Sequence, residues 1–168
     1  GMNMDKKLFY NLIDILDNEI DAYCELRDLF AEKKEILKKA KPEELGSVDN
    51  KILALNNKIQ KLNEQRKNLG FEITGEEANM SKFIEVATEH ASEFVERLEE
   101  RKVKICKTFD EIALLNNQNV ELLKHGMIIS NKMLETIIDA FAPQGCNYNG
   151  AGKTDTHDVN MWTINEEV

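Results

Sequence analysis

A glycine-rich run near the C-terminus is the segment whose residue order comes closest to a nucleotide site. Residues 150–154 are Gly-Ala-Gly-Lys-Thr, and the last three match the end of a phosphate-binding loop, where backbone amides and a lysine hold the phosphates. Such a loop needs a glycine five positions before Gly152, where this chain has Asn147, and it needs a preceding strand and a following helix. The pattern therefore argues against nucleotide binding.

The residues that could hold a metal ion do not complete a site. Asp155, His157 and Asp158 are close together, but they have no fourth ligand near them. Helical di-iron sites need a glutamate three residues before a histidine, and none of the three histidines has one. The cysteines are odd in number and widely spaced, so we expect reduced thiols and no zinc site: they are Cys24, Cys106 and Cys146. The sequence predicts neither a metal nor a cofactor.

The side chains that could perform nucleophilic catalysis are also few and scattered. The three histidines pair with no serine or cysteine at a spacing that would make one the base of the other. Glu121 and His125 are four residues apart, which suits an ordinary surface pair on a helix. We therefore expect no catalytic residues and a protein that is not an enzyme.

The overall composition limits the partners and the compartment. Acidic residues outnumber basic ones by 31 to 22 and give a net charge of −9, which would repel nucleic acid. The longest apolar run, residues 112–115, is far shorter than the roughly 20 residues of a membrane-spanning helix. Gly1 looks like the remnant of a cleaved tag, and the residues after it lack a signal-peptide pattern. These features predict a cytoplasmic protein without membrane insertion.

Spacing of apolar residues predicts an all-α fold. The chain has two prolines and eight glycines, a composition that suits long helices. Apolar residues three or four apart predict helices at about 5–40, 47–69 and 90–141, with a loop at 70–80 and Ser81 as a candidate cap. The pattern leaves open whether a break lies near Thr88. The second helix has heptad spacing, and its short connection to the first predicts an antiparallel pair. We expect one elongated, coiled-coil-like antiparallel bundle in residues 1–150 and a polar tail in 151–168.

The long last helix contains a segment that is apolar on more than one face. Residues 127–141 carry eight large apolar side chains and only three charges. If this helix starts level with the first one, residues 127–141 extend beyond it and lack an intramolecular cover. Exposed apolar surface of this kind suits the binding of a partner's amphipathic helix. The predicted partner-binding residues are Leu123, Met127, Ile128, Met133, Leu134, Ile137, Ile138, Phe141 and Tyr148.

Residues 114–123 read Leu-Leu-Asn-Asn-Gln-Asn-Val-Glu-Leu-Leu, and this asparagine-rich stretch with paired leucines is the most distinctive part of the chain. Together with the Asn147-Tyr148-Asn149-Gly150 tail and the order of the helices, it resembles the FlgN-like flagellar export chaperones over residues 5–150. We expect Asn116 and Asn119 of this stretch to lie at the helical seam, where buried amides fix the register.

The resemblance implies a function of protein binding. It implies a cytosolic chaperone that binds the C-terminal helical segments of hook-filament junction proteins, prevents their premature assembly and delivers them to the export gate. Contacts with export-gate or export-ATPase components are part of that expectation, and Tyr148 is the candidate gate contact. The alternative is a homo-oligomeric coiled-coil scaffold or adaptor, in which residues 127–141 form a permanent interface through self-association.

Overall fold

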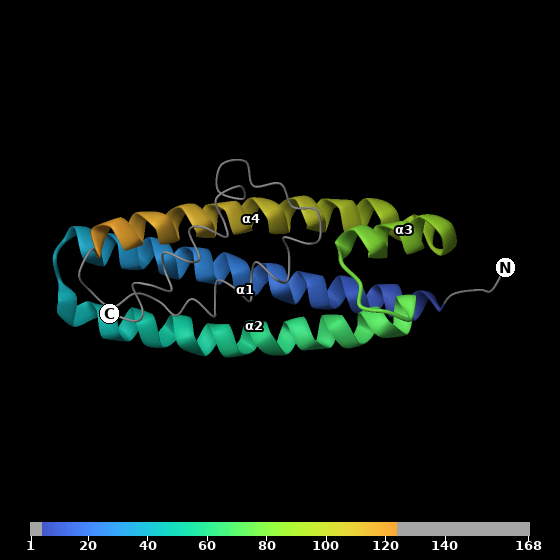
Figure 1. Cartoon of the computed structure of the whole chain (residues 1–168), viewed down its shortest axis with the longest axis horizontal. Coiled ribbons are helices and arrows are strands. Elements are labelled where there is room, and N and C mark those ends of the chain that lie inside the picture. Colours follow the sequence, from blue (N-terminus) through green and yellow to red (C-terminus); the bar gives the residue numbers. More distant parts are fainter. Residues whose placement is uncertain (1–4, 124–168) are drawn as a thin grey trace.

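The computed structural model describes residues 5–123 and shows a bundle of long helices (Figure 1). The helices are α1 (Lys6–Lys38), α2 (Leu45–Thr74), α3 (Met80–His90) and α4 (Val95–Leu122), with short 3-10 helices η1 (Pro42–Glu44) and η2 (Ser92–Phe94). Within this part of the chain there is no strand, which confirms the predicted all-α class.

Helix α1 is the central element, because it packs along both α2 and α4. Contacts between α1 and α2 run in opposite directions along the two helices: Glu19 meets Arg66, whereas Lys33 meets Asp49. Contacts between α1 and α4 keep a constant separation of 84 residues, as in the Asp17–Arg101 and Lys34–Gln118 pairs. Helix α2 is therefore antiparallel to α1, and α4 is parallel to it.

Apolar stripes at heptad-like spacing hold these helices together. The carboxylate of Asp5 caps α1 by accepting a hydrogen bond from the Lys7 amide at 2.9 Å. At the other end of α1, Ala40 turns the chain toward η1 with a positive φ of 52°. The largest apolar side chains with less than 2% exposure are Phe9, Phe30, Phe83, Phe94, Leu12, Leu16, Leu26, Ile52 and Ile59. The core thus extends over the whole length of the bundle.

The second helix is longer than its sequence pattern indicated. It continues to Thr74 rather than ending near residue 69, and Gly70, expected to break it, lies inside it. A Cβ at Gly70 would lie 3.4 Å from the Phe83 ring, so the glycine leaves room for α3 to pack closely. The helix ends at Gly75, whose left-handed φ of 78° favours glycine. The N-cap of α3 is Asn79 rather than Ser81, and the Asn79 side chain accepts a hydrogen bond from the Lys82 amide at 2.9 Å.

The predicted third helix is interrupted near its start. A break occurs at Ala91, where φ is −153° and ψ is 58°, so that α3 ends at His90 and α4 begins at Val95 after η2. Stacking of Phe94 on Phe9, with ring centroids 5.4 Å apart, fixes this corner against the start of α1. Helix α4 ends at Leu122, and residues 124–141 of the predicted helix lie outside the described part of the chain.

Candidate partner-binding site

The end of α4 is level with the end of α1. The 84-residue separation of their contacts places Lys38, the last residue of α1, beside residue 122, the last of α4. At the opposite end, Lys6 pairs with Glu93 at 2.6 Å. Helix α4 therefore runs level with α1 at both ends, and α1 has no further turn beside a straight continuation of α4 past residue 123.

Among the predicted partner-binding residues, Leu123 is the one that the structure describes. It is 9% exposed, and its amide donates to the carbonyls of Asn119 and Val120 at 2.9 and 3.2 Å, which closes the last turn of α4. The adjacent Leu122 is 45% exposed, so the paired leucines point to different environments. The remaining predicted residues lie outside the described range: Met127, Ile128, Met133, Leu134, Ile137, Ile138, Phe141 and Tyr148.

The asparagine-rich stretch lies in the helical seam, as expected. Asn116 is 4% exposed and Asn119 is 2% exposed. The Asn119 amide nitrogen donates to the backbone carbonyl of Phe30 at 3.0 Å, which ties α4 to α1 at one register. This bond can form only where the carbonyl is accessible to a side chain from the neighbouring helix. The prediction that buried amides lie at the seam is confirmed.

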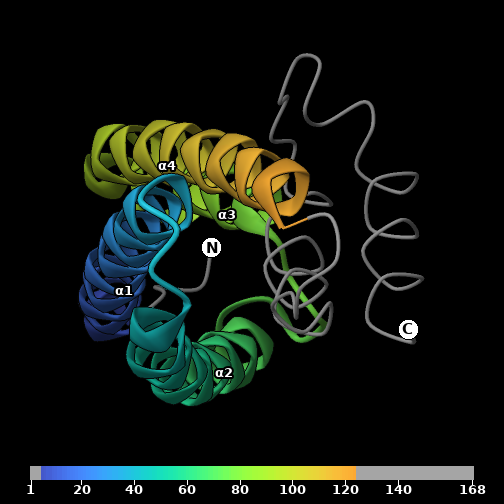
Figure 2. The same cartoon turned by 90° about the vertical axis from the view of Figure 1, so that its left-hand side faces the viewer.

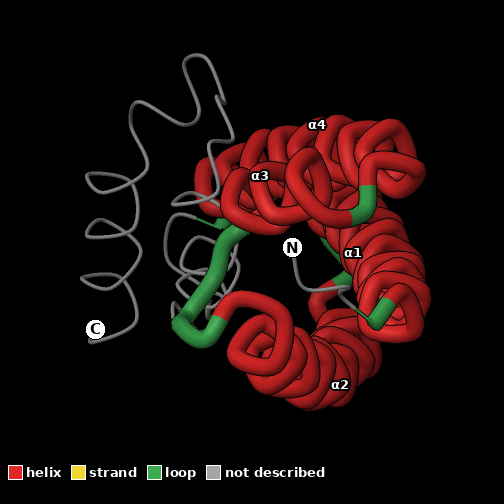
Figure 3. The backbone as a smooth tube through the Cα atoms, turned by 90° about the vertical axis from the view of Figure 1, so that its right-hand side faces the viewer, coloured by secondary structure: helices red, strands yellow, loops and turns green. Residues whose placement is uncertain are grey.

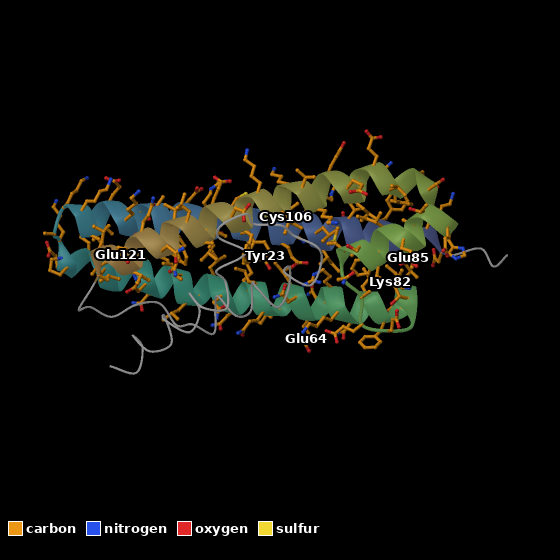
Figure 4. All side chains as sticks on the ribbon, turned by 45° about the horizontal axis from the view of Figure 1, so that its top comes forward. Tyr23, Glu64, Lys82, Glu85, Cys106 and Glu121 are labelled. Atoms are coloured by element: carbon orange, nitrogen blue, oxygen red, sulfur yellow. The ribbon has the colours of Figure 1, made fainter. Side chains whose placement is uncertain are left out.

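A buried polar cluster crosses the α1–α2 seam near the middle of the bundle, where Figure 4 labels Tyr23. The Glu19 carboxylate accepts from the Arg66 guanidinium at 2.9 Å, and both residues are almost completely buried. Asn63 accepts from Arg66 at 3.2 Å and from the Tyr23 hydroxyl at 3.3 Å. The cluster pairs opposite charges inside an apolar core, where an unpaired charge would be costly.

Burial governs the protonation of this cluster. It raises the pKa of the Glu19 carboxyl above its ordinary value, and the nearby Arg66 charge acts in the opposite direction. Burial also raises the pKa of Tyr23 well above 10, so that this phenol keeps its proton and remains a hydrogen-bond donor. The arrangement is suited to fixing the helix register, because each polar group has its partner only when α1 and α2 are correctly aligned.

A second buried cation lies nearer the α1–α2 turn. The Lys33 ammonium is 1% exposed and donates to the Asp49 carboxylate at 2.7 Å. Sequence reasoning missed both this pair and the Glu19–Arg66 pair, because it followed the apolar positions alone. The available signal was a charged residue at a heptad position that is otherwise apolar. Along α1 this position recurs every seven residues, and it holds Leu12, Glu19, Leu26 and Lys33 in turn.

The described surface also carries single exposed apolar side chains. On α4, Val103 is 66% exposed and Leu114 is 56% exposed, while α2 presents Leu53 and Phe71 at 49% and 53%. Leu53 and Phe71 are 18 residues apart, a separation of about 27 Å along the helix, so they do not form one patch. Scattered apolar residues of this kind are normal on a soluble surface and do not mark a site.

The membrane, metal and cysteine features considered from the sequence can be compared with the structure in residues 5–123. No helix in this range is both long and apolar enough to cross a membrane. In the same range no group of three or more side chains is arranged to hold a metal ion. Cys24 is a free thiol, and Cys146 lies outside the described residues. Residues 150–158, with their glycine-rich and acidic segments, lie outside the described range.

The architecture is an all-α bundle in which three long helices pack through apolar seams that contain a few buried polar pairs. A family model described as FlgN protein matches residues 2–156, and the chain therefore belongs to the FlgN family. Searches of the curated proteins and of the solved structures found no match. The family is one of chaperones rather than enzymes, and membership implies a general role in flagellar export and in binding flagellar proteins.

Proposed function

We propose that this protein binds the C-terminal helical segments of hook-filament junction proteins in the cytoplasm, prevents their premature assembly and delivers them to the flagellar export gate. Membership of the FlgN family is the observation that carries the proposal. A chaperone of this kind must recognise a helix that would otherwise pair with another subunit, and apolar side chains on a helical support are suited to that task.

We assign client binding to residues 127–141 together with Leu123. The contact register supports this assignment, because α1 ends level with α4 and offers no partner to a straight continuation of α4 beyond residue 123. Composition supports it independently, since this segment contains eight large apolar side chains and three charges. Buried apolar anchors of this size each contribute on the order of 1–3 kcal/mol to a helix-in-groove complex. Tyr148 is the proposed contact with the export machinery.

Light scattering with purified components tests the proposal against the scaffold alternative. The full chain and a hook-filament junction protein should form a complex whose mass is that of a heteromer, and the chain should suppress the polymerisation of the junction protein. These results follow if the chain covers the helices that the junction protein uses for assembly. A stable homo-oligomer that shows no affinity for the junction protein would contradict the proposal and favour a self-associating scaffold.

A further inference from the structure

One side of α1 lies between α2 and α4 and has no other long helix of the described residues along it. Helices α2 and α4 each pack along α1 but make few contacts with one another. Figure 2 and Figure 3, which look along the bundle from its two ends, both show α2 and α4 on separate sides of α1. We call this side of α1, between the two flanking helices, the α2–α4 lane. A fourth helix placed there would complete a four-helix bundle.

Contacts from α1 show which of its residues form the floor of the lane. Phe9, Leu16, Tyr23 and Phe30 recur every seven residues, and each is at most 2% exposed. Tyr23 donates to Asn63 of α2, whereas Phe9 stacks on Phe94, which directly precedes α4. One stripe of α1 therefore reaches both flanking helices, so it must lie between them. Its side chains are large, mainly apolar and buried, so an occupant of the lane would add to an existing apolar core rather than cover an exposed floor.

Helix α3 already occupies one end of the lane. It packs against both α2 and α4, and the Phe83 ring lies against Gly70. Gly70 is seven residues after Asn63 and fourteen after Asn56, so these three residues share one side of α2. The path that α3 follows at Gly70 therefore continues past Asn63 and Asn56 toward the other end of the bundle.

The length that remains beyond α3 matches an apolar segment of this chain. The registers of the α1–α2 and α1–α4 contacts place Gly70 level with about residue 99 of α4. From there to Leu122, the lane extends for about 35 Å at the rise of an α-helix. Residues 127–141 would span about 22 Å as a helix, and the next helix-breaking residue is Pro143. The segment fits the lane with space for a turn.

The end of α4 is suitable for such a turn. Helix α4 ends at the end of the lane opposite α3, and Leu123 has left the helical conformation with φ −93° and ψ 7°. Three residues, Lys-His-Gly at 124–126, separate it from Met127, and antiparallel helices are commonly joined by two to five residues. The glycine at 126 can adopt the backbone conformations that a tight reversal requires.

One polar atom beside the lane also favours an occupant with hydrogen-bond donors. Asn56 shares its side of α2 with Asn63, and its Oδ1 atom is buried without a hydrogen-bond partner. A buried acceptor of this kind is costly unless a donor reaches it. The segment 127–141 contains Ser130, Asn131 and Thr136 among its apolar residues. An occupant with both apolar and polar side chains suits this lane better than a purely apolar one.

We propose that residues 127–141 form a helix that docks in the α2–α4 lane of the same chain, antiparallel to α4, when no other protein holds them. A straight continuation of α4 would leave these apolar side chains in water, whereas docking buries those on the side that faces the bundle. The inference goes beyond the proposed function and does not depend on the identity of the client. Client binding to this segment would have to displace it from the lane.

Disulfide trapping in the full chain tests the docking. With the three native cysteines replaced by serine, Asn56→Cys is paired in turn with a cysteine at each position from 136 to 140, which the antiparallel register brings level with it. Leu53→Cys is the matched control, because it lies on the same helix and is 49% exposed on another face. Under mild oxidation we expect at least one Asn56→Cys pair to form an intramolecular cross-link at least fivefold faster than every Leu53→Cys pair.

Circular dichroism establishes that each variant remains helical, and hydrogen exchange on the unsubstituted chain provides a second measurement. We expect amide protection in residues 127–141 without any added partner, because docking shields a helix from exchange. Equal cross-linking rates from Asn56→Cys and Leu53→Cys, together with unprotected amides in 127–141, would overturn the inference. Cross-links that form only between two chains would also overturn it and would identify a second copy as the occupant. Neither measurement includes a client, so its outcome is independent of the proposed function.

Discussion

At the scale of single residues, the α1–α2 seam depends on charges that have no access to water. Glu19 is completely buried, Arg66 is 2% exposed, and their 2.9 Å contact lets each neutralise the other. Replacing both partners by apolar groups can be neutral, but removing one leaves the other charge buried and unpaired. The cluster therefore predicts a large asymmetry between single and double substitutions.

Arg66→Met should lower the free energy of unfolding by about 3–5 kcal/mol, because Glu19 is then buried without its partner. Adding Glu19→Leu should restore most of the loss. Urea unfolding followed by circular dichroism measures both variants, with the exposed neighbour Lys67→Met as the control. If Arg66→Met proves as mild as Lys67→Met, the ion pair contributes nothing to the seam.

The raised pKa of Glu19 predicts a dependence of stability on pH. Since burial raises this pKa above 4.5, the folded chain holds the Glu19 proton more tightly than the unfolded chain. The stabilisation from Glu19 is complete below pH 4.5 and is lost as the pH rises through the folded pKa. Glu19→Gln removes this effect, so the unfolding free energy of the wild type relative to the variant should increase on acidification.

Unfolding of both proteins in urea at several values between about pH 4 and pH 7 measures that difference directly. Glu64→Gln, at an exposed position of α2 labelled in Figure 4, controls for the general loss of a carboxylate. A wild-type advantage over Glu19→Gln that stays constant or decreases toward low pH would show that burial does not control this carboxyl group.

At the scale of helices, apolar spacing was sufficient to predict α1, most of α2 and the seam position of Asn116 and Asn119. It failed where a residue's local preference was overruled by packing. Gly70 looked like a helix end, but it lies inside α2 where Phe83 of α3 packs against the helix, a contact that no local pattern contains. The sequence left open whether a break lies near Thr88, because the stacking of Phe94 on Phe9 beside the break at Ala91 joins residues far apart in the sequence.

Gly70 inside α2 and Gly75 at its C-terminal end should respond in opposite directions to alanine. Gly70→Ala places a Cβ at 3.4 Å from Phe83, an ordinary contact, and improves helix propensity, so we expect a gain of about 0.5–1 kcal/mol. Gly75→Ala forces an L-residue to φ 78° and should lose about 1 kcal/mol. Thermal unfolding of the two variants provides the comparison. A destabilised Gly70→Ala would mean that α3 packs too closely to accept a methyl group.

At the scale of the whole molecule, both proposals depend on the pairing of α1 with α4. Their parallel contacts end together at Lys38 and Leu122, and the apolar segment 127–141 follows directly. The apolar composition of this segment and the resemblance to the family could be read from the sequence, and the family match agrees with that resemblance. It could not predict that α2 and α4 would both pack on α1 with few contacts between them, because apolar spacing along one helix does not say which neighbour each side faces.

The central claim is that residues 127–141 bind the client, and isothermal titration calorimetry tests it most directly. The titrant is a peptide carrying the C-terminal helix of a hook-filament junction protein, and the sample is the full chain. Met133→Glu with Ile137→Glu should weaken binding by about a hundredfold or more, because two apolar anchors become charged. The matched control is Val103→Glu with Leu114→Glu, which charges two exposed apolar residues of α4. It should change the affinity by less than about threefold, since surface substitutions away from a site have small effects. An undiminished affinity in the Met133 and Ile137 variant, or an equal loss in the control, would contradict the account.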